Sequence, residues 1–342
     1  MIENYRELLT ELRAIHEAIR EAVVKACEES AIEQLSAVVA EDDAGDTIFA
    51  IDRVSEEILL QHFERLAQRW PCLLVAEGLG ATGKKILPEG NDLSQVKIVV
   101  IVDPIDGTRG LMYQKRPAWI LTGAAPYRGD ETNLTDIELA LQTEIPLLKQ
   151  HLSDTLWAIQ GGEVGGERYN RLDGTRQPLK PRPSRATTIA QGYGNISRFF
   201  PGTRGELAQV DDELVEKILG PVEAGKAQSF EDQYICSGGQ FYELIMGHDR
   251  WLADLRPVVE PLLQKRGKTL GICCHPYDVC TELIAREAGV IITNEFGKPL
   301  ATKLEVDAPV AWIGYANPTI QGQVAPVLHA LLVERGLDAG LE

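Results

Sequence analysis

The sequence of 342 residues lacks the basic surplus that nucleic-acid-binding proteins use. Its formal net charge is −17, with 34 Lys and Arg residues against 51 Asp and Glu residues. Binding to a phosphate backbone needs clustered Lys and Arg side chains, so we expect no nucleic-acid partner. Solubility accounts for most of the negative charge.

A long apolar run is also missing. No stretch approaches the roughly 18 apolar residues that a membrane-spanning helix needs. The first residues, MIENYRELLTELRAIHEAIREAVVKA, alternate charged and apolar residues at helical spacing and do not have the pattern of a signal peptide. These absences predict a cytoplasmic protein with no membrane partner.

Cysteines are few, and none forms a paired C-x-x-C motif. The six cysteines are irregularly spaced, which disfavours both a disulfide framework and a structural zinc site. The glycine-rich GGEVGG at 161–166 has no Lys-Ser/Thr after it, which excludes a P-loop.

What the chain does contain is typical of a globular α/β protein, with 44% hydrophobic and 25% charged residues. Apolar spacing predicts helices over residues 3–40 and 52–69. Short runs rich in branched residues predict strands at 73–76, 97–102, 118–125 and 155–160.

Three further segments bear on the domain organisation. Residues 161–176 are rich in turn formers and predict a hairpin. Residues 127–153 are polar and then helical in character, and we expect an insertion over the sheet. The Pro-rich segment 178–188 predicts a boundary between an N-terminal half, 1–180, and a C-terminal half, 181–342, of one compact unit.

The strongest local signal is IVVIVDPIDGTRG at 98–110. An apolar strand ends at Asp103, Asp106 follows three residues later, and Gly107 permits a tight turn. Two carboxylates and the carbonyl of Ile105 then converge at a strand end, where they suit a hard cation such as Mg²⁺. The alternative is a turn whose aspartates cap backbone amides.

Other acidic residues stand at comparable positions. Glu77 ends the apolar run LLVAEG, and Asp278 stands at the start of a predicted helix. Asp46 and Asp52 lie in GDTIFAID, just before another helix. Helix capping is the simpler interpretation of the three aspartates.

In this order, the segments resemble the inositol monophosphatase-like family, which includes fructose-1,6-bisphosphatases and bisphosphate nucleotidases. DPIDGT at 103–108 is similar to its metal-binding signature, DTIFAID at 46–52 to its upstream acidic element, and PYDVCTELIAREAGVIITNEFGKPL at 276–300 to its later acidic segment. The resemblance covers roughly residues 40–315. It implies an α/β fold, a layered αβαβα sandwich, and a homodimer.

The same resemblance implies hydrolysis of a small phosphate monoester with two or three Mg²⁺ ions. By motif match the metal ligands are Glu77, Asp103, the carbonyl of Ile105, Asp106 and Asp278. Thr108 would orient the attacking water, with Asp46 relaying its proton. The amides of Gly107 and Thr108 would bind the phosphate at a helix start.

Substrate selection is expected from the second half. Residues 237–254 resemble the family segment that ends in a carboxylate for substrate hydroxyls; Asp254 is the nearest candidate and Asp249 the alternative. Surface acids on a helix–strand connection are an equally good interpretation of both.

Several substrates remain open. The leading one is inositol monophosphate or a related polyol or sugar phosphate, and the alternatives are fructose 1,6-bisphosphate and 3′-phosphoadenosine 5′-phosphate. A non-catalytic protein that keeps the fold and binds a metal or a phosphate ligand is the alternative of another class. Gly78 stands where the family has a second glutamate, which puts a third metal ion in doubt.

Overall fold

The computed structural model describes residues 2–30, 32–36, 38–41, 47–77, 79 and 82–337. The helices in these ranges are α1 (Tyr5–Glu29), α2 (Ile32–Leu35), α3 (Ala50–Leu66), α4 (Thr108–Met112), α5 (Arg204–Leu219), α6 (Ser237–Met246), α7 (Glu260–Lys265), α8 (Pro276–Val279), α9 (Glu282–Glu287) and α10 (Pro318–Glu334). Short 3₁₀ turns lie at η1 (Leu93–Gln95), η2 (Leu134–Asp136) and η3 (Pro257–Val259).

Within the described ranges, the strands form three sheets. Their bounds are β1 (Val38–Glu41), β2 (Thr47–Phe49), β3 (Cys72–Ala76), β4 (Lys84–Leu87), β5 (Ile98–Asp106), β6 (Ala118–Pro126), β7 (Leu139–Ile145), β8 (Leu152–Ile159), β9 (Val164–Asn170), β10 (Arg176–Pro178), β11 (Tyr193–Ile196), β12 (Asp249–Asp254), β13 (Ile291–Thr293) and β14 (Trp312–Tyr315). β1 and β2 form a small hairpin, an eight-stranded sheet has the order β10-β9-β8-β7-β6-β5-β3-β4, and a four-stranded sheet has the order β11-β12-β14-β13.

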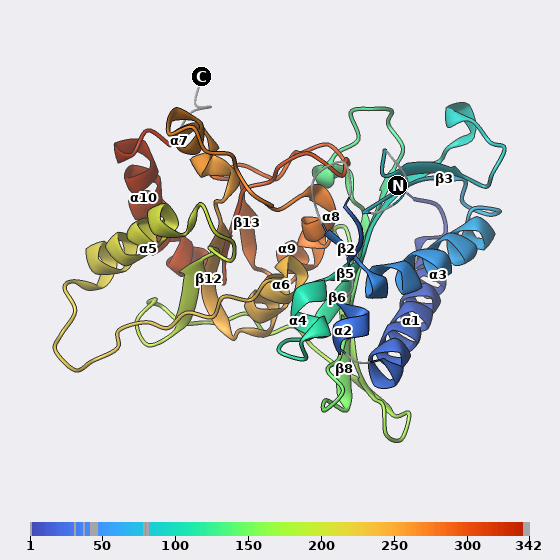
Figure 1. Cartoon of the computed structure of the whole chain (residues 1–342), viewed down its shortest axis with the longest axis horizontal. Helices are drawn as coiled ribbons and strands as arrows, with labels where there is room; N and C mark the ends of the chain where they lie inside the picture. The colour runs from blue at the N-terminus through green and yellow to red at the C-terminus, as the bar shows by residue number, and fades with distance from the viewer. Residues whose placement is uncertain are drawn as a thin grey trace.

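The elements are stacked in five layers (Figure 1). Helices α1 and α3 cover one face of the eight-stranded sheet, and α6, α8 and α9 cover its other face. Of these middle helices, α6 and α9 also pack against the four-stranded sheet, whose far side is covered by α5 and α10. Three apolar cores lie between these layers. This confirms the predicted layered αβαβα sandwich.

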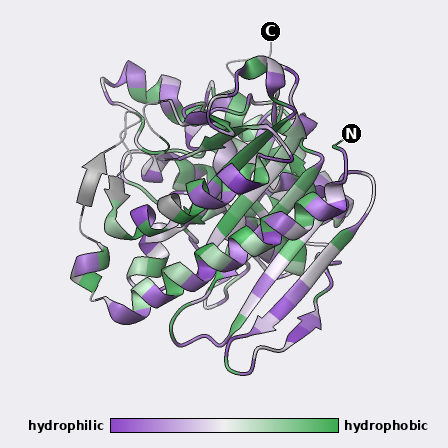
Figure 2. Cartoon of the chain, turned by 90° about the vertical axis from the view of Figure 1, so that its right-hand side faces the viewer, coloured by the Kyte–Doolittle hydropathy of each residue, from purple (hydrophilic) through white to green (hydrophobic). Residues whose placement is uncertain are grey.

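The outer helices cover the sheet because they are amphipathic. In α1 the buried residues recur every three or four positions, from Leu8 through Leu12, Ile15 and Ile19 to Val23. Figure 2 shows hydrophilic and hydrophobic residues alternating along the long helices of this layer. None of the helices in the described ranges has the length and apolar character needed to cross a membrane.

The site lies at one edge of the large sheet, set by a parallel strand pair. β3 and β5 are parallel, with Ala76 opposite Val102. The carboxyl ends of parallel strands meet at the same sheet edge, so Glu77, which follows β3, lies beside Asp103. The remaining pairs of this sheet are antiparallel.

Residues 127–153 are not a helical insertion, which corrects the sequence-based expectation. They contain the turn η2 and the buried strand β7, which pairs with β6 and β8 in the middle of the sheet. The predicted hairpin is present as β8 and β9. The eight-stranded sheet ends at Pro178 and the four-stranded sheet begins at Tyr193; the division into halves at 180/181 stays a prediction.

Candidate active site

The turn after β5 gathers the first acidic residues. Pairing between β5 and β6 is regular as far as Asp103 and shifts register before Asp106, around Pro104, which has no N–H to donate. Gly107 follows with φ 93°, in the left-handed region that favours glycine. A Cβ there would lie 3.0 Å from the Cβ of Cys236, so the close approach of the segment before α6 also requires glycine.

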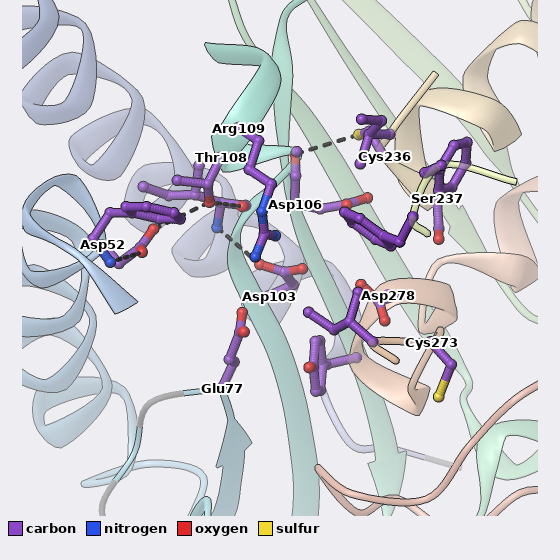
Figure 3. Close-up of a pocket in the computed structure, with 18 of the residues that line it drawn as sticks. Asp52, Glu77, Asp103, Asp106, Thr108, Arg109, Cys236, Ser237, Cys273 and Asp278 are labelled. Carbon is purple, nitrogen blue, oxygen red and sulfur yellow. Dashed lines mark hydrogen bonds between the residues drawn. The ribbon is translucent and has the colours of Figure 1, made fainter. Parts of the chain in front are cut away.

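Three carboxylates meet beside this turn. Asp103 and Asp106 come from β5, and Asp278 comes from the short helix α8, which packs against β5 and β6. One oxygen of each lies within 4.8 Å of the others, a spacing that suits a metal ion. Figure 3 shows the three side chains directed at a common space, with Glu77 on its lower side.

Backbone amides orient these carboxylates. The N–H of Ile105 donates to Asp103 Oδ1 at 2.9 Å, and that of Gly238 donates to Asp106 Oδ2 at 2.6 Å. The N–H of His275 donates to Asp278 Oδ2 at 2.6 Å. The Gly238 contact depends on a missing side chain, because a Cβ would lie 2.5 Å from Leu121 Cδ2.

Crowding in a buried place makes ionisation of all three costly. Burial, and then the neighbouring Asp106, Glu77 and Asp278 carboxylates, raise the pKa of Asp103 well above its ordinary value. Burial raises the pKa of Asp106 to about 6, although the Gly238 amide lowers it. Burial and the Asp106 charge also raise the pKa of Asp278. A bound cation would relieve this repulsion.

Thr108 begins α4 and contacts a carboxylate that sequence reasoning treated as a helix cap. Its Oγ1 lies 3.1 Å from Asp52 Oδ1 and 2.8 Å from the carbonyl oxygen of Ile105. Asp52 also caps α3, because its Oδ2 accepts the N–H of Phe49 at 2.8 Å. Asp46, the predicted proton relay, lies outside the described residues, as does Gly78. The signal that was missed is the second aspartate of DTIFAID.

These groups border one cavity of about 660 Å³, counting the space open to solvent. Its lining includes every predicted metal ligand, as well as Gly107 and Thr108. The remaining lining comes from Phe49, Asp52, Arg109, Phe199, Phe200, Ile235, Cys236, Ser237, Arg256, Ile272, Cys273 and Tyr277. The structure therefore brings together Glu77, Asp103, Ile105, Asp106, Thr108 and Asp278 from three separate parts of the chain.

The two predicted substrate-binding carboxylates do not line this cavity. Asp254 is fully buried, and both of its oxygens accept hydrogen bonds from the Arg256 guanidinium. Asp249 lies at the opposite end of β12, where burial and the Glu243 charge raise its pKa to about 7. Arg256, two residues after Asp254, does line the cavity, although sequence reasoning did not single it out.

The cysteines near the cavity are free thiols. Cys236 Sγ lies 3.3 Å from the carbonyl oxygen of Asp106, and Cys273 Sγ lies 3.9 Å from His275 Nε2. Burial raises the pKa of Cys236 and of Cys280 well above the ordinary value, which argues against a thiolate nucleophile.

Sequence comparison finds no relative for this chain: no protein-family model matches it, and no curated protein is significantly similar to it. Solved structures do match. The holo fructose-1,6-bisphosphatase of Leishmania major has a TM-score of 0.68 and 13% identity, covering 95% of this chain and 93% of that one. The inositol monophosphatase II of Staphylococcus aureus has a TM-score of 0.60 and 15% identity, covering 98% and 100%.

The IMPase of Thermotoga maritima gives the same result, with a TM-score of 0.57 and 17% identity over 94% of this chain and 98% of that one. At these identities the likeness establishes the fold. It agrees with the resemblance noted from the motifs DTIFAID, DPIDGT and PYDVCTELIAREAG.

Proposed function

Because this chain has the inositol monophosphatase-like fold, we propose that it is a phosphatase of that family that hydrolyses a small phosphate monoester with Mg²⁺. The observation that carries the proposal is the meeting of Asp103, Asp106 and Asp278 within 4.8 Å in the cavity that also holds the Thr108–Asp52 pair. Fold alone does not specify a reaction, so the argument rests on these groups.

The donor set fits magnesium. Carboxylate oxygens and the carbonyl oxygen of Ile105 are hard ligands, and Mg²⁺ binds through a few carboxylates while keeping several waters. Burial and the neighbouring carboxylates raise the pKa values of Asp103 and Asp278, and a bound cation would favour the ionised form of both. We propose these residues, with Glu77, as ligands for two ions; a third ion stays a prediction, because Gly78 is outside the described residues.

Bound Mg²⁺ would neutralise the phosphate dianion, lower the pKa of the attacking water and stabilise the leaving oxygen. The protein's own part is to position that water and accept its proton. As the water oxygen bonds to phosphorus, the ester P–O bond breaks. One proton of the water passes through the Thr108 hydroxyl to Asp52, and the departing alkoxide takes a proton from solvent. No covalent phosphoenzyme forms.

One assignment follows the structure more than the sequence motif. Asp52 replaces Asp46 as our proposed proton acceptor, because its Oδ1 lies 3.1 Å from Thr108 Oγ1. Asp46 remains an untested candidate. The amides of Gly107 and Thr108 stay proposed phosphate donors, because both residues line the cavity at the start of α4. Cytoplasmic location and a homodimer also stay predictions.

Phosphate release from a panel of inositol, sugar and nucleotide phosphates tests the proposal. We expect release in Mg²⁺ and none in EDTA. The matched control is Asp249→Asn, which removes a buried carboxylate that does not line the cavity and is expected to keep the activity. Folded protein that releases no phosphate from any substrate at high Mg²⁺ would contradict the proposed function.

A further inference from the structure

One wall of the cavity carries a buried cation. Arg256 follows β12 and is 5% exposed, yet it lines the cavity together with the acidic cluster. Its charge is close enough to lower the pKa values of Asp106 and Asp278. Burial disfavours the guanidinium, but the facing Asp254 carboxylate raises its pKa above the ordinary value, so the charge is permanent.

Arg256 is held rigidly. Its Nε lies 2.9 Å from Asp254 Oδ1, and its Nη2 lies 2.5 Å from Asp254 Oδ2. Its Nη1 donates to the carbonyl of Ile272 at 2.9 Å. The guanidinium also stacks on two rings, 5.0 Å from the centroid of Phe199 and 5.4 Å from that of Phe200. Its side chain therefore needs little reorganisation to bind a ligand.

Donor capacity remains on this wall. A guanidinium has five N–H donors. Three of these donors bind Asp254 and Ile272. The other two, one on each terminal nitrogen, have no acceptor among the described residues. A second cation lies nearby. The Arg109 guanidinium lies 5.4 Å from the centroid of the Phe200 ring, which the Arg256 guanidinium also contacts.

This wall offers a hydrogen-bond donor, whereas a wall that binds a polyol is expected to offer an acceptor. A carboxylate would accept hydrogen bonds from substrate hydroxyls, but Asp254 is fully buried and occupied by Arg256. What the cavity presents is a charged donor that pairs best with a carboxylate or phosphate. The reacting phosphate, on the proposed function, is held at the carboxylate cluster, so Arg256 is left to recognise another group.

We propose that Arg256 is a specificity-determining residue that binds a second anionic group, a phosphate or a carboxylate, on the substrate. The inference rests on the proposed function and narrows its substrate class.

Matched substrate pairs test this. Fructose 1,6-bisphosphate against fructose 1-phosphate reports a second phosphate, and 2-phosphoglycerate against glycerol 2-phosphate reports a carboxylate. We expect kcat/KM with Mg²⁺ to favour the more anionic member of at least one pair by about 10- to 100-fold, the range of a hydrogen bond to a charged group. The pair that shows the preference identifies the group.

Two variants then link the preference to Arg256. Arg256→Lys keeps a positive charge but loses the paired N–H donors of the guanidinium. The double variant Asp254→Asn with Arg256→Gln replaces the buried ion pair by a neutral pair, so that no unpaired Asp254 charge is left buried. In the double variant the ratio of the two kcat/KM values is expected to fall to about 1, a loss of about 10- to 100-fold. Arg168→Lys is the control, because Arg168 makes the same fork to Asp154, with N–O distances of 2.7 and 2.6 Å, and does not line the cavity.

The outcomes separate the two proposals. Mg²⁺-dependent hydrolysis with no preference in either pair, or a preference that survives the double variant, overturns the inference and leaves the proposed function standing. Equal losses for both members of a pair would assign Arg256 to the reacting phosphate and also overturn the inference. No Mg²⁺-dependent release from any of the four substrates overturns the proposed function, and the inference with it.

Discussion

The floor of the cavity and the strands β7–β9 both bury carboxylates, but they surround them with different partners. At the floor, Asp103, Asp106 and Asp278 face one another and accept hydrogen bonds from backbone amides. On β8, Asp154 accepts two bonds from Arg168 and one from the Tyr242 hydroxyl at 2.6 Å.

The difference indicates what each group is for. A buried charge that is paired and hydrogen-bonded has a favourable or nearly neutral effect on the stability of the folded state. Like charges crowded together lower that stability. The balanced Asp154 holds strands together. The crowded floor is retained at a cost to stability, which is expected of a site that awaits a cation.

The largest expected effect comes from removing one of the three crowded carboxylates. Asp103→Asn removes a proposed metal ligand, and loss of several kcal/mol of metal assistance corresponds to a fall in kcat of about 1,000-fold or more. In EDTA the same variant is expected to have a higher Tm than the parent, because repulsion with Asp106, Glu77 and Asp278 is relieved. Activity assays and thermal melts of the same preparations measure both.

Asp154→Asn is the matched control, and its expected effect on stability is opposite to that of Asp103→Asn. It leaves Arg168 and Tyr242 without their charged partner, so stability falls by about 2 kcal/mol, while activity of the folded protein remains. If both variants were destabilised alike in EDTA, the contrast between crowded and balanced carboxylates would be wrong.

The next effect tests the proton path without removing a metal ligand. Thr108→Ala deletes the hydroxyl that lies 3.1 Å from Asp52, and kcat is expected to fall by about 100- to 10,000-fold, the range for positioned proton transfer. Thr108→Ser keeps a hydroxyl and should recover much of the rate. A large rise in the Mg²⁺ concentration needed for half-maximal rate would instead make Thr108 part of the metal site.

Sequence reasoning succeeded where the relevant residues are neighbours in the chain. DPIDGT places two carboxylates, a carbonyl and a glycine turn within six residues, so the floor needed no knowledge of the packing. The order of the acidic segments then predicted which distant residues, Glu77 and Asp278, lie with them. The layered fold followed from the same resemblance.

The failures concern residues whose role is set by tertiary packing. LALQTEI at 139–145 contains good helix formers, but the middle of a sheet overrides that preference and makes it β7. Asp52 looks like a helix cap and is one; its second contact exists only because α3 and α4 meet. Arg256 gains its setting from Phe199, Phe200 and Ile272, which are distant in sequence.

The smallest expected effect concerns Asp249, a buried carboxylate to which no described side chain donates a hydrogen bond. Burial and Glu243 raise its pKa to about 7 from an ordinary value near 4 in the unfolded chain. The folded state thus binds the proton more tightly, and stability falls as pH rises from about 4 to about 7.

Asp249→Asn removes this penalty. We expect its Tm advantage over the parent to be absent near pH 4, to grow up to about pH 7 and to stay constant above it, with a size of roughly 2 °C or more. An advantage that did not change with pH would show that Asp249 is not the titrating group, and unchanged hydrolysis would separate this carboxylate from the cavity.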